Sequence, residues 1–255
     1  MHRKSELMLI DTHCHIHETD YPLEIVTTLE HAHGQGVERL LCVGTSEESS
    51  RQSIAFATEH DEAFASIGVH PHDSKDGYRG IESLIGSSKL VAVGEIGLDY
   101  FYSHSPRQTQ IEALEWQIDL ALKNNLPIIF HVRGAFDDFW PIYNNFSGIQ
   151  GVLHSFTDSQ TNLDLGLERG LYIGVNGIST FTRDAAQKAV FGSIPLNRLL
   201  LETDAPFLTP VPFRGKVNEP AFVYNIAQYH ATSRNILFEE VARATTTNAH
   251  ALFAI

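Results

Sequence analysis

Two histidines one residue apart near the N-terminus, His13 and His15, could bind a single metal ion. They follow the apolar run 7–10 and belong to the segment Asp11-Thr12-His13-Cys14-His15. Because side chains alternate between the two faces of a strand, both imidazoles would point the same way, with Asp11 behind them. A His-x-His pair is also common by chance in strand-to-loop turns. The pair alone therefore leaves metal binding and a polar turn as equal alternatives.

The same kinds of side chain recur where other apolar runs end. They are His70, Glu95, His131, His154 and Asp204. A lone histidine at a strand end is more often a hydrogen-bonded surface residue than a ligand. A whole set at separate strand ends favours metal binding instead.

These residues supply enough ligands for two divalent ions, and Glu95 is the acidic residue placed to bridge them. Two ions that share a water molecule lower its pKa and stabilise both the attacking and the leaving oxygen of a hydrolysis. Imidazole ligands favour Zn²⁺, Mn²⁺ or Co²⁺. The pattern therefore indicates a hydrolase that depends on two divalent metal ions.

Alternating strands and helices would position these side chains. Eight short apolar runs read as buried parallel strands, at 7–11, 39–43, 63–69, 90–95, 127–131, 151–154, 171–175 and 198–202. Amphipathic segments read as helices, among them 21–33, 48–59, 108–124, 183–191 and a closing helix at 239–253.

Eight strand–helix units in 255 residues predict an α/β fold, a single (β/α)8 TIM barrel that spans residues 1–255. Its functional site would lie at the C-terminal ends of the strands, where all the candidate ligands stand. A doubly wound sheet is the main alternative, but no glycine-rich phosphate loop follows the first run.

Composition limits the partners and the compartment. The net charge of −13 argues against a broad basic surface for duplex nucleic acid. No apolar run approaches the roughly 20 residues that span a bilayer, and the polar segment 1–6 does not read as a secretory signal. Cys14 and Cys42 are expected to be free, buried thiols. We therefore expect a cytoplasmic protein with no membrane partner and no evident obligatory protein partner.

Seven motifs, in order along the chain, resemble those of the TatD-type metal-dependent deoxyribonucleases, a family of amidohydrolase-like barrels. They are D-T-H-C-H at 11–15, G-V-H-P-H at 68–72, G-E-I-G-L-D-Y at 94–100, L-P at 126–127 leading to H-V-R at 131–133, V-L-H-S-F at 152–156, L-E-T-D-A-P at 201–206 and R-G-K-V-N-E-P at 214–220. The resemblance runs from residue 11 to about residue 253. It implies a two-metal hydrolase, commonly assayed with Mg²⁺, that acts as a 3′ exonuclease on single-stranded DNA.

The resemblance also implies a role for each matching residue. His13, His15, Glu95 and Asp204 would hold one ion. Glu95, His131 and His154 would hold the other. His70, Glu202 and Asp204 would surround the reacting water and phosphate, with Asp204 accepting the proton of the water.

Other side chains near the same strand ends are candidates for binding the nucleic-acid substrate. Tyr100, in the aromatic run 100–102, and Phe156 could stack on bases, although rim packing is an alternative for Phe156. Arg133, Arg214 and Lys216 could bind phosphate, with an ordinary surface charge as the alternative, above all for Lys216.

The remaining histidines and one carboxylate are expected to play supporting parts. Asp99 could orient a histidine ligand or cap a loop. The histidines expected at the surface are His2, His31, His33, His60, His104, His230 and His250, and those expected near the rim are His17 and His72.

Two other functions fit the same residues. A barrel of this kind could hydrolyse a carboxylic ester, amide or lactone, for example an aminoacyl ester on transfer RNA, because fold does not fix the substrate. The chain could also be a metal-binding interaction module without turnover. Activity on carboxylic esters with none on DNA would favour the ester hydrolase. Tight metal binding without hydrolysis of any ester or phosphodiester would favour the interaction module.

Overall fold

A computed structural model describes residues 8–102 and 104–255 of the chain. Its eight strands form one parallel sheet in which each strand pairs with the next along the chain. The strands are β1 (Leu9–Cys14), β2 (Val37–Val43), β3 (Ala63–Ile67), β4 (Leu90–Asp99), β5 (Ile128–Arg133), β6 (Gly151–Leu153), β7 (Tyr172–Val175) and β8 (Leu199–Leu201). The predicted TIM barrel is confirmed. Leu7 and the polar segment 1–6 lie outside the described residues.

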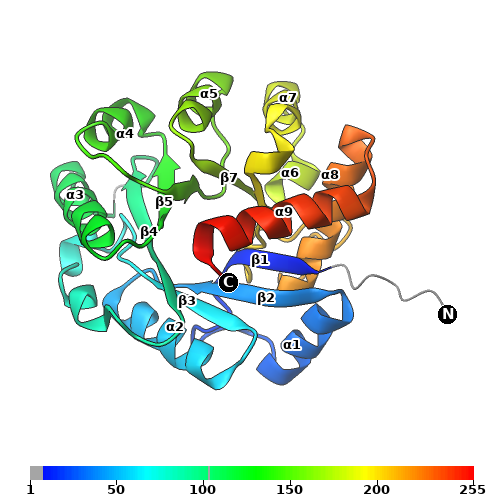
Figure 1. Cartoon of the computed structure of the whole chain (residues 1–255), viewed down its shortest axis with the longest axis horizontal. Coiled ribbons are helices and arrows are strands. Elements are labelled where there is room, and N and C mark those ends of the chain that lie inside the picture. The colour runs from blue at the N-terminus through cyan, green and yellow to red at the C-terminus, as the bar shows by residue number, and fades with distance from the viewer. Residues whose placement is uncertain (1–7, 103) are drawn as a thin grey trace.

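Helices surround the sheet on the outside (Figure 1). They are α1 (Ile25–Gly34), α2 (Glu47–Glu59), α3 (Arg107–Lys123), α4 (Phe136–Tyr143), α5 (Gln160–Glu168), α6 (Ile178–Phe181), α7 (Ala185–Ser193), α8 (Val223–Arg234) and α9 (Phe238–Phe253). Short 3₁₀ helices are η1 (Ser74–Asp76), η2 (Gly80–Leu84), η3 (Leu196–Arg198) and η4 (Pro220–Phe222). After β3 the described chain forms η1 and η2 where the strand–helix rhythm predicted an α-helix.

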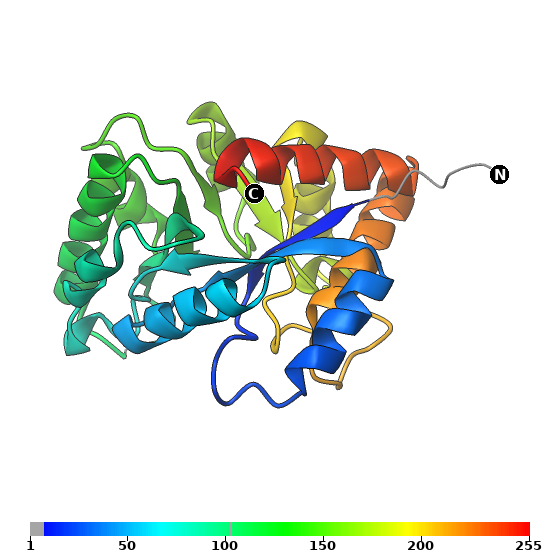
Figure 2. The ribbon, with the colours of Figure 1, turned by 60° about the horizontal axis from the view of Figure 1, so that its bottom comes forward.

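The apolar residues of the strands build two layers of core. One layer faces the surrounding helices, where Phe130 of β5 packs against Phe139 of α4 at 5.1 Å between ring centroids. The other fills the barrel and continues into Leu252 and Phe253 of α9. Helix α9 lies across one end of the barrel (Figures 1 and 2) and is fixed there by Asn248, whose amide donates to the Leu199 carbonyl at 2.8 Å. The amino ends of the strands are thereby covered, and their carboxyl ends are left for the site.

The barrel closes through the residues that follow β8. Asp204 N donates to His13 O at 2.8 Å, and His15 N donates to Ala205 O at 2.7 Å. Behind this seam, the Asp11 carboxylate accepts the Thr203 backbone N–H at 2.8 Å and contacts its hydroxyl at 2.5 Å. Asp11 therefore joins the first strand to the end of the last, which fixes the histidines beside Asp204.

Several strands differ from their predicted ends in ways that matter for the site. β1 continues to Cys14 and so contains His13, and β5 continues two residues past His131 to Arg133. β4 continues four residues past Glu95 because its later half pairs with β5, with Gly97 opposite His131 and Asp99 opposite Arg133. β6 ends at Leu153, so His154 follows directly after the strand. Within the described chain, no helix combines the length and apolar character needed to cross a membrane.

Candidate metal centre and active-site cleft

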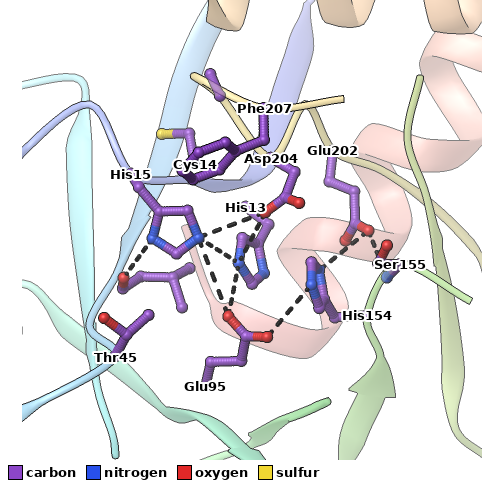
Figure 3. Close-up of polar contacts among 12 residues, drawn as sticks. His13, Cys14, His15, Thr45, Glu95, His154, Ser155, Glu202, Asp204 and Phe207 are labelled. Carbon is purple, nitrogen blue, oxygen red and sulfur yellow. Dashed lines mark hydrogen bonds and ion pairs between the residues drawn. The ribbon is translucent and has the colours of Figure 1, made fainter. Parts of the chain in front are cut away.

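The two histidines of the first motif converge, as the strand alternation predicted. His13 Nε2 and His15 Nε2 are 3.1 Å apart (Figure 3). Asp204 Oδ1 lies 3.6 Å from the first nitrogen and 3.4 Å from the second. His15 is held by a 2.9 Å contact between its Nδ1 and the Val43 carbonyl, which leaves Nε2 directed at the centre.

Glu95 lies between two sets of histidines and presents a different oxygen to each. Its Oε2 is 3.3 Å from His13 Nε2 and 4.0 Å from His15 Nε2. Its Oε1 is 2.7 Å from His131 Nδ1, 3.5 Å from His154 Nε2 and 3.6 Å from His70 Nε2. A carboxylate in this position can share its two oxygens between two ions.

The donor atoms fit divalent ions. Three sets of ligand atoms each lie within 4.8 Å of one another, namely His13–His15–Asp204, His13–Glu95–His154 and His70–Glu95–His131. Closely spaced imidazole nitrogens together with carboxylate oxygens are the ligand set of hydrolytic metal sites. His70 belongs to one of these sets, so its position fits a ligand as well as the place beside the reacting water that the resemblance implies.

The proposed ligands differ in protonation when no ion is bound. Burial would lower the pKa of His15 and His154, but the carboxylates around them outweigh it and raise the values to about 9 and about 10, so an ion must displace a proton from each. Burial and the nearby charge of His154 lower the pKa of His13. Burial and the nearby charge of His131 lower the pKa of His70. A neutral imidazole has a nitrogen lone pair for an ion. Burial would raise the pKa of Glu95, but His154, His70 and hydrogen bonds from His13 and His131 hold it well below its ordinary value. The carboxyl group of Glu95 is therefore ionised.

Two buried carboxylates orient histidines from behind. Asp99 Oδ2 accepts His131 Nε2 at 3.1 Å and His72 Nε2 at 3.0 Å. Glu202 Oε1 lies 3.1 Å from His154 Nδ1 and accepts the Ser155 N–H at 2.6 Å. Glu202 is buried and is not among the residues that line the cleft, and its contacts in the structure are to His154 and Ser155. Its place beside the reacting water and phosphate stays a prediction.

Two buried glutamines on one face of α3 were missed by the sequence analysis. Gln110 Oε1 accepts Asp99 N at 2.9 Å and its amide donates to Asp99 O at 3.1 Å. Gln117 makes the same pair of bonds to Val69, at 2.7 and 3.1 Å. These side chains fix the backbone next to His70 and at Asp99. Their seven-residue spacing, which keeps them on one helix face, was the available signal.

A cleft of about 640 Å³ opens above the centre. His70, His131, His154 and Asp204 line it together with Glu95. Among the described residues that line it, Arg133 is the only arginine or lysine. Arg133 Cζ lies 4.1 Å from the ring centre of Phe101 and 5.1 Å from that of Tyr102.

The predicted substrate-binding residues fall into different environments. Phe156 is 3% exposed and packs against Phe136, so the prediction that it stacks on a base is wrong. Tyr100 donates its hydroxyl to Asp138 at 2.8 Å, and Arg107 covers its ring. The exposed aromatics of that run are Phe101 and Tyr102, at 64% and 43%.

The two cations of the loop after β8 do not line the cleft. Arg214 donates to Thr209 O at 2.7 Å and lies 3.8 Å from the ring centre of Phe181, and Lys216 lies near Phe213. Their predicted contact with substrate phosphate therefore has no support in the cleft geometry. The cation within the cleft is Arg133.

Three other predictions about histidines and cysteines can be compared with the structure. His230 is 1% exposed and contacts the Ser179 hydroxyl at 3.1 Å, so its predicted surface position is wrong. His17 is buried and contacts Ser49 Oγ at 3.1 Å. Cys14 and Cys42 are free, buried thiols at paired positions of β1 and β2.

Comparisons with known proteins identify the family of the chain. The profile of the family described as TatD related DNase matches residues 10–254. An uncharacterized metal-dependent hydrolase of Bacillus subtilis, YabD, is 39% identical over 97% of this chain and 100% of its own. The 3′-5′ ssDNA/RNA exonuclease TatD of Citrobacter rodentium is 36% identical over 88% of this chain and 89% of its own.

A solved structure gives the same result for the fold. The crystal structure of YJJV, a TatD homologue from Escherichia coli K12, superimposes with a TM-score of 0.91 at 28% identity and covers 98% of this chain and 99% of its own. The family profile and these relatives extend over nearly the whole chain. The chain therefore belongs to the TatD family of metal-dependent hydrolases.

Proposed function

We propose that the chain is a two-metal phosphodiesterase that removes nucleotides from the 3′ end of single-stranded DNA. The observation that carries this proposal is the position of Glu95, whose two oxygens face two separate sets of histidines. A paired-ion centre suits phosphodiester hydrolysis, because it can stabilise both the attacking and the leaving oxygen. The name of the exonuclease relative from Citrobacter rodentium supports a nucleic-acid substrate.

The residues that would hold the ions are those that converge in the cleft. His13, His15 and Asp204, with Glu95, would hold one, and Glu95 with His131 and His154 the other. His70 is close enough to Glu95 to join the second set. Bound divalent ions, Mg²⁺, Zn²⁺ or Mn²⁺, would offset the negative charge of the phosphate and make a water molecule more acidic.

Asp204 is placed to take the proton from the attacking water. Burial raises the pKa of its carboxyl, but a hydrogen bond from His15 and the charges of His154 and His13 outweigh burial and hold it at about 2. The carboxylate is therefore ionised at neutral pH and has lone pairs for a proton. Because a carboxylate of low pKa is a weak base by itself, the transfer depends on bound ions that would make the water more acidic. In the reaction, the water oxygen bonds to phosphorus, the P–O3′ bond breaks, and a proton passes to the released O3′ of the shortened strand.

The cleft suits an unpaired strand better than a duplex. Arg133 offers one positive charge to a phosphate, and Phe101 and Tyr102 offer exposed rings beside it for bases. A duplex would need many cations along its backbone, and the chain carries a net charge of −13. Single-stranded ends therefore match the charge and the exposed rings of this surface.

The test is cleavage of a 5′-labelled single-stranded oligonucleotide by metal-stripped protein, titrated with Mg²⁺, Mn²⁺ and Zn²⁺. We expect a ladder that shortens from the 3′ end only when an ion is added. Glu95→Ala should abolish it, and Glu59→Ala, at an exposed position of α2, should not. Full metal-dependent cleavage by Glu95→Ala would refute the assignment. Metal binding without any ladder would direct attention to carboxylic esters and lactones.

A further inference from the structure

A second pocket adjoins the active-site cleft on the side away from Arg133. Its volume is about 330 Å³, and it shares His15, Glu18 and Phe207 with the cleft. Phe207 is 58% exposed and stands beside His15 (Figure 3). The other walls are Asp20, Tyr21, Pro22, Pro206 and Val217. The pocket is therefore a side arm of the cleft, with His15, Glu18 and Phe207 at the boundary between them.

The two arms differ in cationic groups. The cleft has Arg133 beside its carboxylates and the proposed ion-binding residues, whereas the described lining of the side pocket has the carboxylates Glu18 and Asp20 and neither arginine nor lysine. Glu18 is fixed in place, because its Oε1 accepts the Ser49 hydroxyl at 3.1 Å and contacts the Thr45 hydroxyl at 3.5 Å. A phosphate in the side pocket would meet these negative charges, so this arm suits an uncharged group with hydroxyls.

We propose that the side pocket binds the terminal nucleoside of the 3′ end, with its 3′-hydroxyl donating a hydrogen bond to Glu18. This inference rests on the proposed exonuclease function. The phosphate on the 5′ side of that nucleoside then lies at the histidine–carboxylate centre next to His15. The rest of the strand, with its remaining phosphates, continues past Arg133 and the exposed rings of Phe101 and Tyr102.

The shape and chemistry of the pocket match a nucleoside. Phe207, Tyr21 and Pro22 present rings and apolar surface to a flat base. The carboxylate of Glu18 can accept a hydrogen bond from a sugar hydroxyl. A pocket of a few hundred Å³ is the usual size for a small-molecule group. Specificity for a free 3′-hydroxyl follows, because a 3′-phosphate would bring like charge against Glu18.

The experiment compares two 5′-labelled oligonucleotides that differ only in a 3′-hydroxyl or a 3′-phosphate. Wild-type protein should cleave the hydroxyl form at least about 30-fold faster, since like charges in a confined site cost a few kcal/mol. Glu18→Gln keeps the acceptor oxygen for Ser49 and removes the charge, so it should narrow this ratio to about threefold or less. Glu59→Gln on α2 is the matched control and should leave the ratio unchanged.

Binding to a cleavage-impaired variant gives a second measurement. Fluorescence anisotropy with Asp204→Asn should show weaker binding of the 3′-phosphate form, and adding Glu18→Gln should remove most of the difference. If Glu18→Gln does not fold, Asp20→Asn, at an exposed position of the same pocket, should narrow the cleavage ratio in the same direction.

The possible failures are distinguishable. Equal cleavage of both oligonucleotides by wild-type protein would overturn this inference and leave the exonuclease proposal standing. An unchanged ratio in the Glu18 and Asp20 variants would also overturn it. No cleavage of either oligonucleotide with any ion would refute the exonuclease proposal itself, and this inference with it.

Discussion

Replacing Asp99 with asparagine should weaken the metal centre without touching a proposed ligand. Asp99 Oδ1 accepts the Phe101 and Tyr102 N–H groups at 2.9 and 3.1 Å, and Oδ2 accepts His131 and His72. In either orientation of an asparagine side chain, its NH₂ group faces two donors. The variant therefore loses two of the four hydrogen bonds. If the NH₂ group faces the histidines, His131 loses its partner; if it faces Phe101 and Tyr102, His131 keeps its partner but the loop at residues 101–102 loses its two bonds.

The size of the effect follows from this count. Outer partners of ligating histidines typically contribute 10–100-fold in metal affinity, which corresponds to about 1.4–2.7 kcal/mol. Two lost bonds in a buried site should lower the free energy of unfolding by about 2–4 kcal/mol. The negative charge of Asp99 is present throughout the neutral range, because hydrogen bonds from His131 and Tyr102 outweigh burial and keep its pKa well below its ordinary value.

The assay is titration calorimetry of metal-stripped protein with Zn²⁺ or Mn²⁺, together with urea unfolding. Asp164→Asn, at an exposed position of α5, is the control and should change neither quantity. A metal affinity within twofold of wild type in folded Asp99→Asn would refute the argument, since it would show that His131 does not depend on Asp99. A loss of stability alone would assign Asp99 a purely structural role.

Three further changes test other parts of the structure. Burial, with the charge of Arg234, lowers the pKa of His230 to about 3, so below pH 6.5 the unfolded chain binds a proton that the folded chain does not. Between pH 7 and pH 5, the free energy of unfolding of the wild-type protein in urea should therefore fall by about 2 kcal/mol more than that of His230→Gln. An equal fall in the two proteins would contradict this assignment. Gly97→Ala should destabilise the barrel and weaken metal binding, because a Cβ at this position overlaps the His131 carbonyl oxygen. An unchanged thermal unfolding temperature together with an unchanged metal affinity would contradict this. Phe139→Ala should cost about 3–5 kcal/mol in urea unfolding, since its ring is fully buried, while metal affinity stays near that of wild type.

The positions of the proposed ligands could be predicted from the sequence because barrel topology places every strand end on one rim. His13, His131 and His154 needed only their place at the end of an apolar run to be brought together. The length of β4 could not be predicted in the same way. Its extension beyond Glu95 depends on pairing with β5, a contact between segments far apart in the sequence.

Burial of single side chains was harder to predict than the sheet. Phe156 lies two residues after the proposed ligand His154, but the chain turns between them and the ring enters the layer beneath α4. His230 lies on the buried stripe of α8 that Val223, Ile226, Ala227 and Ala231 form. That helical spacing was the available signal for its burial, and its ring contacts Ser179 of a distant segment. The side pocket combines residues from the loops after β1 and after β8, which no local pattern connects.

The closure of the barrel has a consequence for how the protein is made. The Asp11–Thr203 contacts that join the first strand to the end of the last link residues 192 positions apart. During synthesis, His13 and His15 leave the ribosome long before Asp204, so the nascent chain has only part of the centre. Since chains emerge at about 5–20 residues per second, this interval is on the order of ten seconds or more. The complete set of ligands therefore exists only when the barrel is nearly finished, and a truncated chain ending before residue 204 cannot assemble it.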